Sequence, residues 1–202
     1  MGYDNYDLQE VDPYLIPGST CLQNSLGIQD TKSLNRAEAE ISAAALAELI
    51  VQPVEPTFDR EHLCCIHKRL FGDIYPWAGT LRESETGKGG MLFLPWRSIP
   101  EAVDEVLASL QREHLLASLG EKEFAERAAY YLGRINAIHP FREGNGRAQR
   151  VFLDQLAELA GYGFEWSAIS GEQMALACNE ARQEEPDYRK LIRLLQLHIV
   201  TL

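Results

Sequence analysis

Residues 134–150 read RINAIHPFREGNGRAQR, and this stretch organises the rest of the chain. Pro140 disfavours helical backbone for the residue before it, so an incoming helix is predicted to end beside His139. The sequence GNG at 144–146 then predicts a tight turn that leads into a second helix near Arg147. We therefore expect two helices joined by a short loop, with a histidine at the end of one and glycines at the start of the other.

The residue types in this stretch are those that phosphate chemistry needs. Successive backbone N–H groups at 144–146, at the start of a helix, favour an anion through hydrogen bonds and the helix dipole. Arg147 and Arg150 lie three residues apart, so both guanidinium groups are expected to reach phosphate oxygens. Glu143 is suited to hold Mg²⁺, and His139 is suited to take a proton from an attacking hydroxyl at neutral pH.

Each of these features alone has an ordinary structural explanation. A histidine before proline often just ends a helix, two arginines at this spacing often form a solvated face, and a GNG turn often just starts a helix. Their combination within twelve residues favours nucleotidyl transfer.

Composition restricts the class of protein. The chain has 202 residues, with 19 Lys and Arg against 30 Asp and Glu and a net charge of −11. This balance argues against a nucleic-acid binder, because phosphate backbones require a basic face. Hydrophobic residues at 46% and charged residues at 24% are typical of one globular domain over 1–202. The acidic start lacks a secretory signal, and no apolar run is long enough to span a membrane. The four cysteines do not have the spacing of a disulfide framework. We therefore expect a cytoplasmic protein.

The hydrophobic pattern predicts an all-α protein with one β-hairpin. An irregular arm at 1–32 precedes a core at 33–170, and two further helices follow within 171–202. Helices are predicted at 34–51, 59–71, 100–119, 121–138, 147–160, 171–183 and 187–197, and the hairpin at 80–95. The inward faces of two of these helices are predicted to include Ile41, Ala45, Leu46 and Leu49, and Val151, Phe152, Leu156 and Leu159. His62, Cys65 and His67 lie close enough in one helix to suggest zinc, but Cys64, Cys65 and Ile66 of that helix are interpreted as core residues, which disfavours a zinc site.

The chain resembles the Fic family. HPFREGNGRAQR at 139–150 matches the family motif HxFx(D/E)GNGRxxR at every defined position. DPYLIPGS at 12–19, IHKRLFGDIYPWAGTLRE at 66–83 and GKGGMLFLP at 87–95 also resemble Fic segments in the same order. The resemblance thus covers nearly the whole chain and implies a Fic helical bundle with a hairpin flap over the active site.

The resemblance implies a protein adenylyltransferase, which transfers AMP from ATP to a hydroxyl side chain of a target protein with Mg²⁺. It implies that His139 is the general base, that Phe141 anchors the loop and that Glu143 is the Mg²⁺ ligand. The implied phosphate-binding residues are Gly144, Asn145, Gly146, Arg147 and, for the γ-phosphate, Arg150.

The hairpin is implied to be a flap that docks an extended target segment by strand addition. The expected docking edge comprises Lys88, Gly89, Gly90, Met91, Leu92, Phe93 and Leu94. A two-stranded ribbon that merely covers the pocket is the structural alternative.

Fic proteins that resemble this one are commonly inhibited by a glutamate that pairs with the second motif arginine, here Arg150. That glutamate lies in the pattern (S/T)xxxE(G/N). Only Thr57 with Glu61 and Ser109 with Glu113 have the right spacing, and each glutamate is followed by histidine. We therefore expect the inhibitory glutamate on a separate small antitoxin.

Other functions remain open at this point. A Fic-type phosphotransferase would have lysine where Gly146 stands, which argues against it. A de-AMPylating variant, an enzyme with another nucleotide, and a noncatalytic nucleotide-binding module are the remaining alternatives, although His139 and Glu143 are both present. The resemblance implies a bacterial toxin that acts on type II topoisomerase ATPase subunits.

Overall fold

The computed structural model describes residues 12–202, and helices dominate it as the sequence predicted. The helices are α1 (Thr31–Val51), α2 (Arg60–Phe71), α3 (Ile99–Arg112), α4 (Glu121–Ile138), α5 (Asn145–Leu159), α6 (Gly171–Glu180) and α7 (Arg189–His198). Single 3₁₀ turns occur at Trp96–Ser98, His114–Leu116 and Trp166–Ala168.

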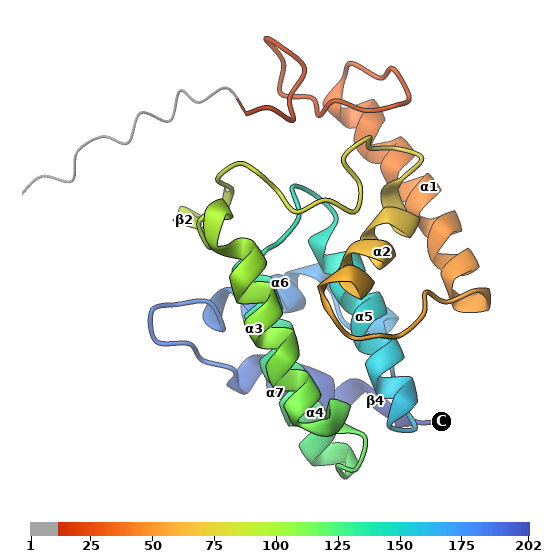
Figure 1. Ribbon diagram of the computed structural model, residues 1–202, viewed down its shortest axis with the longest axis vertical. Coiled ribbons are helices and arrows are strands. Elements are labelled where there is room, and N and C mark those ends of the chain that lie inside the picture. The colour runs from red at the N-terminus through yellow and green to blue at the C-terminus, as the bar shows by residue number, and fades with distance from the viewer. Residues whose placement is uncertain (1–11) are drawn as a thin grey trace, which may run out of the picture.

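Helix α4 packs against helices on several sides and has the predicted bounds. Its inward face is buried as expected, since Phe124, Ala128, Leu132 and Ile135 are all at most 2% exposed. Helices α3, α5, α6 and α7 pack against it. In Figure 1 α3 lies in front of α4. The C-terminal end of α4 therefore lies among these helices, close to the start of α5.

Other helix bounds differ from the predicted ones. Helix α3 ends at Arg112 instead of residue 119, because residues His114–Leu116 adopt positive φ values of 54°, 54° and 57°. Such left-handed backbone cannot continue a right-handed helix. Helix α5 begins two residues earlier than predicted, at Asn145, and α6 ends at Glu180 instead of residue 183.

Two predicted inward residues were wrong. Leu46 is 37% exposed and Leu159 is 50% exposed, since each lies at the edge of its helix away from the core. The buried face of α1 carries Glu38 and Ser42 as well as leucines. These polar residues are inside because both bind Arg147 of α5.

The predicted hairpin is present but small. Strands β1 (Gly87–Lys88) and β2 (Met91–Leu92) are antiparallel, with Gly87 opposite Leu92 and Lys88 opposite Met91. Gly89 and Gly90 between them have φ of 64° and 79°, the conformation that a two-residue hairpin turn requires. The remainder of 80–95 is loop.

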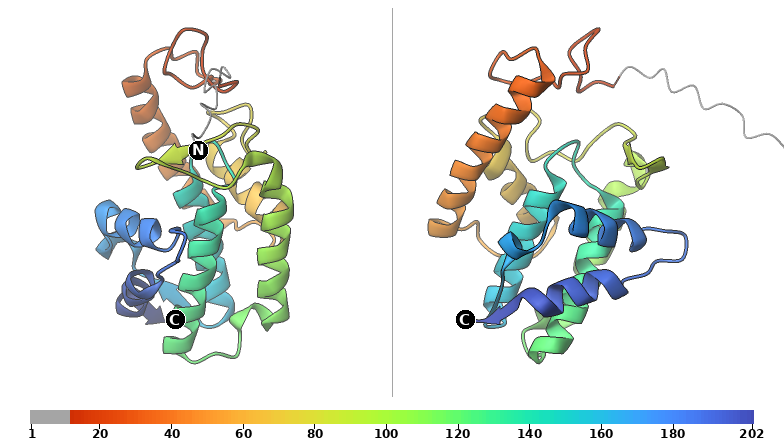
Figure 2. Two further views of the ribbon diagram at one scale, coloured as in Figure 1. Left: turned by 90° about the vertical axis from the view of Figure 1, so that its left-hand side faces the viewer. Right: turned by 180° about the vertical axis from the view of Figure 1, so that it is seen from behind.

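A second strand pair was not predicted. Strands β3 (Tyr162–Phe164) and β4 (Ile199–Thr201) are antiparallel and join the end of the chain to the segment after α5 (Figure 2). Three-residue strands are too short to show a periodic pattern, so sequence reasoning missed them.

The N-terminal arm is irregular over 12–30, as expected, and its residues 1–11 lie outside the described part. An isolated bridge joins Leu15 to Leu22. The arm reaches the motif region, because the Arg142 guanidinium donates to the Asp12 carboxylate at 2.8 Å. The Glu83 N–H donates to the Tyr14 hydroxyl at 2.9 Å, which attaches the arm to the base of the flap segment.

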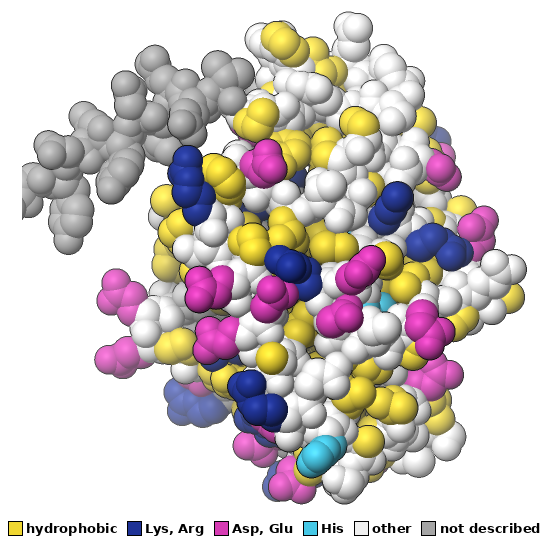
Figure 3. Space-filling model, in the orientation of Figure 1, with side chains coloured by type: hydrophobic (Ala, Val, Ile, Leu, Met, Phe, Trp, Pro, Cys, Tyr) yellow, Lys and Arg dark blue, Asp and Glu magenta, His cyan; other side chains and the backbone are white. Residues whose placement is uncertain are grey.

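The surface reflects the mixed charge of the sequence. Acidic and basic side chains alternate with apolar ones across the face shown in Figure 3. None of the helices within residues 12–202 is long and apolar enough to cross a membrane.

Candidate active site

The loop between α4 and α5 begins at His139. This residue ends α4 with left-handed backbone, at φ 52° and ψ 65°, and its N–H still donates to the carbonyl of Ile135 at 3.0 Å. The helix stop predicted from Pro140 is therefore confirmed, although the backbone is left-handed instead of extended. The His139 carbonyl accepts from the Arg82 Nε at 2.8 Å, which fixes this unusual conformation.

The loop is closed by Asn145. Its side-chain amide donates to the carbonyl of Phe141 at 2.7 Å, and its side-chain oxygen accepts from the Phe141 N–H at 2.9 Å. Phe141 is buried, so its ring anchors the loop in the core. The Asn145 side chain thus holds the loop, which leaves its backbone N–H for a ligand.

His67 of α2 packs against the loop and holds it in place. Its ring stacks on Phe141 with centroids 3.9 Å apart. Its Nδ1 accepts from the Gly79 N–H at 2.9 Å, so Nε2 carries the proton and donates to the Glu143 carbonyl at 2.9 Å. Burial lowers the pKa of His67 to about 4, which keeps the ring neutral. His67 is thus a buried residue that positions the loop.

The glycines at the start of α5 have different roles. Gly144 has φ 78°, and a Cβ there would collide with the Phe71 ring. Gly146 faces open space, with nothing within 4 Å of the Cβ position. The N–H groups of Asn145 and Gly146 are in the first turn, where a helix offers them no acceptor. The structure therefore has an accessible helix N-terminus, which attracts an anion.

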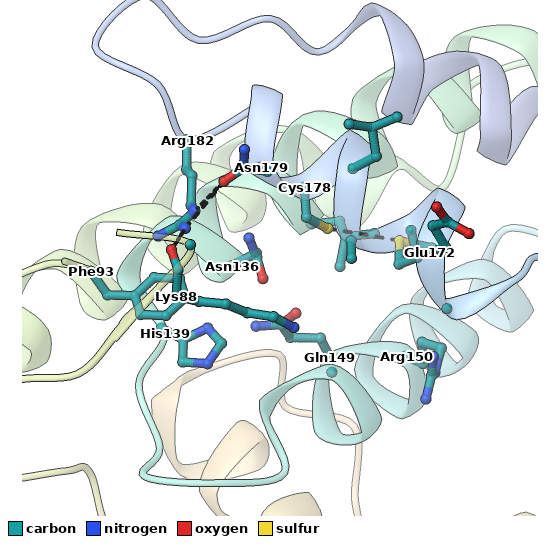
Figure 4. A pocket seen from close by; sticks show the side chains of 17 residues that line it. Lys88, Phe93, Asn136, His139, Gln149, Arg150, Glu172, Cys178, Asn179 and Arg182 are labelled. Carbon is teal, nitrogen blue, oxygen red and sulfur yellow. Dashed lines mark hydrogen bonds between the residues drawn. The ribbon is translucent and has the colours of Figure 1, made fainter. Parts of the chain in front are cut away.

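A cavity of about 570 Å³ opens beside this helix N-terminus. Its seventeen lining residues come from the flap, α4, α5 and α6, and Figure 4 shows their side chains. One wall, on α6, carries Met174, Ala175, Leu176 and Cys178. The lining residues include three cationic side chains and one acidic one: Lys88, Arg150, Arg182 and Glu172. The cavity is thus locally cationic in a chain with net charge −11.

His139 faces this cavity and is held by the flap. Its ring lies parallel to that of Phe93, with centroids 3.7 Å apart and planes within 7°. Burial lowers the pKa of His139 to about 3, and the charges of Arg82 and Arg182 act in the same direction. Its Nδ1 is buried without a hydrogen-bond partner among residues 12–202. The imidazole is therefore neutral at physiological pH and has a lone pair available.

Arg82 attaches the flap segment to the end of α4. Its side chain is 0% exposed and donates to four carbonyls. Two of these belong to Ile138 and His139, and two to Ser84 and Leu94. A buried guanidinium is tolerated only when its donors are satisfied, and here they join the two segments that meet at His139.

The two motif arginines diverge. Arg147 turns toward α1, where it donates to the Ser42 hydroxyl at 2.9 Å and forms an ion pair with Glu38. It does not line the cavity, whereas Arg150 does. Within residues 12–202 no carboxylate lies within 4.0 Å of the Arg150 guanidinium. The joint contact of both arginines with phosphate, expected from their spacing, is not preformed in this structure.

Glu143 is half-exposed and is not among the residues that line the cavity. One carboxylate oxygen accepts from the Gly144 N–H at 2.9 Å and lies 3.9 Å from the Arg147 guanidinium. No group of three or more His, Cys, Asp or Glu side chains in the described chain could hold a metal ion. A Mg²⁺ ion at Glu143 would therefore need oxygens from a bound nucleotide, which is how this ion is usually held.

The predicted docking edge divides into inner and outer residues. Leu92 is 65% exposed, whereas Phe93 is 8% exposed and packs on His139. Arg182, just beyond α6, donates to the carbonyls of Lys88 and Met91 and covers the Phe93 ring, with 4.4 Å to its centroid. The flap is thereby attached to α6 across the cavity mouth.

Sequence reasoning missed several residues that shape this site. Arg82, His67 and Arg182 act through contacts with distant backbone, and no local pattern marks such contacts. Gln149 lines the cavity and is 3% exposed. A signal for it was available, because it lies three residues after Gly146 on the same face of a predicted helix.

This fold and site define a known class of protein. The model of the Fic/DOC family matches residues 57–157, and the chain belongs to this family. The chain is 39% identical over 161 residues to "Probable protein adenylyltransferase Fic" of Salmonella typhimurium, covering 80% of each chain. It is 39% identical over 170 residues to "Protein adenylyltransferase VbhT" of Bartonella schoenbuchensis, which is 84% of this chain and 36% of that protein. The chain therefore spans about a third of the length of VbhT.

Solved structures agree with this assignment. The BepC protein of Bartonella tribocorum, solved with bound AMPPNP, aligns with a TM-score of 0.88 at 28% identity and covers 94% of this chain and 97% of that chain. The N-terminal Fic domain of a Bartonella quintana effector, solved with bound ADP, aligns with a TM-score of 0.87 at 28% identity, covering 93% and 94%. The predicted Fic fold is confirmed.

Proposed function

We propose that this chain is a protein adenylyltransferase that transfers AMP from ATP to a hydroxyl side chain of a target protein. The observation that carries this proposal is the junction of a neutral histidine, an open helix N-terminus and a cationic cavity at one loop. The names of the relatives and the adenine nucleotides bound to the neighbouring structures support ATP as the substrate.

The reaction needs one proton transfer and one displacement. The target hydroxyl oxygen attacks the α-phosphorus, the bond from that phosphorus to the bridging oxygen of the β-phosphate breaks, and pyrophosphate leaves. His139 accepts the hydroxyl proton, for which its neutral imidazole is in the right state. The N–H groups of Asn145 and Gly146 stabilise the charge on the phosphate oxygens, because they are fixed in place before the reaction.

The remaining phosphates are proposed to lie toward Arg150. This arginine lines the cavity one turn into α5 from Gly146, so a chain of phosphates that starts at the helix N-terminus can reach it. Glu143 would hold Mg²⁺ together with phosphate oxygens, and the ion would neutralise charge between the phosphates.

The target is proposed to dock at the flap by strand addition. The exposed Leu92 side chain is available to a target segment, while Phe93 stays inside on His139. Main-chain pairing would bring a hydroxyl residue of the target over His139. A type II topoisomerase ATPase subunit in the bacterial cytoplasm is the target class that we propose to test first.

Inhibition is proposed to come from a separate small protein whose glutamate reaches Arg150. Glu113 is not available for this role, because it is bound to Arg127 and to the Tyr131 hydroxyl. In the described residues no carboxylate lies within 4.0 Å of the Arg150 guanidinium, which leaves it open to a glutamate in trans. A toxin and antitoxin pair is the arrangement that this supports.

The test is transfer of label from ATP labelled at the α-phosphorus to proteins of a bacterial lysate. The wild type should label a protein band, and His139→Ala should reduce the rate by about 10²–10⁴-fold, since general-base catalysis contributes that much. His139→Ala should still bind ATP in calorimetry. Label from the γ-phosphorus instead of the α-phosphorus would indicate a phosphotransferase, and unchanged transfer by His139→Ala would refute the assigned base.

A further inference from the structure

The cavity contains a polar group that the proposed mechanism leaves unexplained. Gln149 is 3% exposed, and its Nε2 is buried with no hydrogen-bond partner among residues 12–202. An unsatisfied buried amide donor destabilises the free protein. A group of this kind is retained at little net cost when a ligand supplies the missing acceptor.

Gln149 lies where a ligand would meet it. It lines the cavity, and Figure 4 shows its side chain between His139 and Arg150. It is three residues after Gly146, so its side chain and the open N-terminus of α5 share one face of the helix. A ligand oxygen that accepts from the first N–H groups of α5 would therefore lie close to the Gln149 Nε2 donor.

A second donor approaches from the flap. Lys88 belongs to β1, and we expected it at the edge that docks the target. Figure 4 shows its side chain extending inward across the cavity toward Gln149. Lys88, His139 and Cys178 line the same cavity, and the ammonium charge contributes to the lowered pKa of His139.

The backbone of Lys88 is held by Arg182. The Arg182 guanidinium donates to the Lys88 carbonyl and, at 3.1 Å, to the Asn179 side-chain oxygen of α6. Figure 4 shows both interactions. The backbone of Lys88 is thus attached to α6 on the far side of the cavity, and Figure 4 shows its side chain over α5.

We infer that Lys88 and Gln149 bind the α-phosphate of the nucleotide from opposite sides, Lys88 from the flap and Gln149 from α5. This inference deepens the proposed function and rests on it for the placement of the α-phosphorus beside His139. Both groups are donors, which suits phosphate oxygens. Among residues 12–202 the Gln149 Nε2 has no hydrogen-bond partner, and Lys88 is exposed. Lys88 is then a nucleotide-binding residue in addition to any part its backbone takes in target docking.

Through Lys88, the position of the flap affects phosphate binding and transfer. Lys88 lines the cavity while its backbone carbonyl accepts from Arg182. Because charge builds on the α-phosphate oxygens during transfer, an ammonium held there lowers the barrier. Displacement of the flap would therefore weaken both target docking and phosphate binding.

The experiment compares three ligands by calorimetry: ATP, AMP and adenosine, each with the whole chain. Lys88→Met and Gln149→Leu should each weaken ATP and AMP by about tenfold, because both ligands contain the α-phosphate, and should leave adenosine unchanged. Lys88→Arg should retain most of the affinity. The matched controls are the exposed Lys32→Met and Gln52→Leu on or next to α1, which should change none of the three affinities.

A thermal melt separates a ligand contact from a structural role. Gln149→Leu removes an unsatisfied donor, so its Tm should equal or exceed that of the wild type. A Tm several degrees lower would mean that Gln149 supports the fold, and the inference would be wrong for that residue.

The other outcomes are equally decisive. Weaker ATP binding with unchanged AMP binding would place the pair on the outer phosphates and overturn the assignment. Unchanged affinity for both nucleotides would exclude the contact. If the wild type binds nucleotides but transfers no AMP, the proposed function fails alone, and the affinities of the variants still decide the role of Lys88 and Gln149.

Discussion

The phenyl ring of Phe93 lies flat on the imidazole of His139, with ring centroids 3.7 Å apart and planes within 7°. The contact joins the flap segment to the motif loop, two parts of the chain separated by two helices. It also keeps water from one face of the imidazole, and burial is the main cause of the lowered pKa of His139. The state of the candidate base thus depends on a residue of the flap.

Removal of this ring should change the titration of His139. We expect Phe93→Ala to raise its pKa from about 3 toward the ordinary value of about 6.5, because water gains access to the imidazole. Transfer should fall by about 10-fold to 100-fold, since the ring loses its fixed orientation. An NMR titration of the histidine resonances measures the pKa. The neighbouring exposed Leu92→Ala is the control, and an equal pKa in both variants would contradict the role of the stack.

The two motif arginines should have separable effects. Arg147→Met leaves Glu38 and Ser42 without their cation, so the free energy of unfolding should fall by about 2 kcal/mol. Arg150→Met should leave Tm nearly unchanged and weaken ATP by about tenfold more than AMP, because its proposed partner is the γ-phosphate. Denaturant unfolding and calorimetry measure the two effects. Equal losses of ATP and AMP in Arg150→Met would show that it does not bind the γ-phosphate.

The metal prediction concerns Glu143. Glu143→Ala should raise the Mg²⁺ concentration needed for half-maximal transfer by about tenfold or more, because its carboxylate is the proposed protein ligand. Excess chelator should have a similar effect on the wild type. ATP binding without Mg²⁺ should be unchanged, and the exposed Glu158→Ala on α5 serves as the control. A normal Mg²⁺ dependence in Glu143→Ala would remove Glu143 from the site.

The free energy of unfolding should decrease as the pH is lowered through a range in which most carboxylates are still ionised. The folded pKa values of His67 and His139 are lowered to about 4 and about 3, so the folded state stays unprotonated while the unfolded chain binds protons below about pH 6.5. Each histidine should therefore remove about 1.4 kcal/mol per pH unit between about pH 6 and 5. Denaturant unfolding across this range measures the slope. His67→Gln should reduce this slope by about 1.4 kcal/mol per pH unit, the contribution of one histidine. An unchanged slope would contradict the neutral state of the buried His67.

Expression in a bacterium tests inhibition in trans. The chain alone should arrest growth, and the His139→Ala variant should not, because arrest requires the transfer reaction. If the chain is silent and Glu61→Gly or Glu113→Gly activates it, the inhibitory glutamate is internal and the proposal is wrong. Growth curves together with label transfer in the same cells give the measurement.

The sequence by itself determined the helical class, the bounds of α4 and the loop from His139 to Gly146. These follow from local rules: a 3.6-residue hydrophobic period, a proline that ends a helix, and glycines that start one. The motif also determined the family, because residue type and spacing are properties of the linear chain.

Only the tertiary structure decided which groups meet in the cavity. The divergence of Arg147 and Arg150 depends on where Glu38 lies, and Glu38 reaches Arg147 only after α1 and α5 have both packed against α2. The stack of Phe93 on His139, and the inward turn of Lys88 above Gln149, depend on the attachment of the flap by Arg82 and Arg182. Contacts between residues tens of positions apart leave no periodic trace in the sequence, because they are set by the packing of whole helices and by the burial of charges that must find partners.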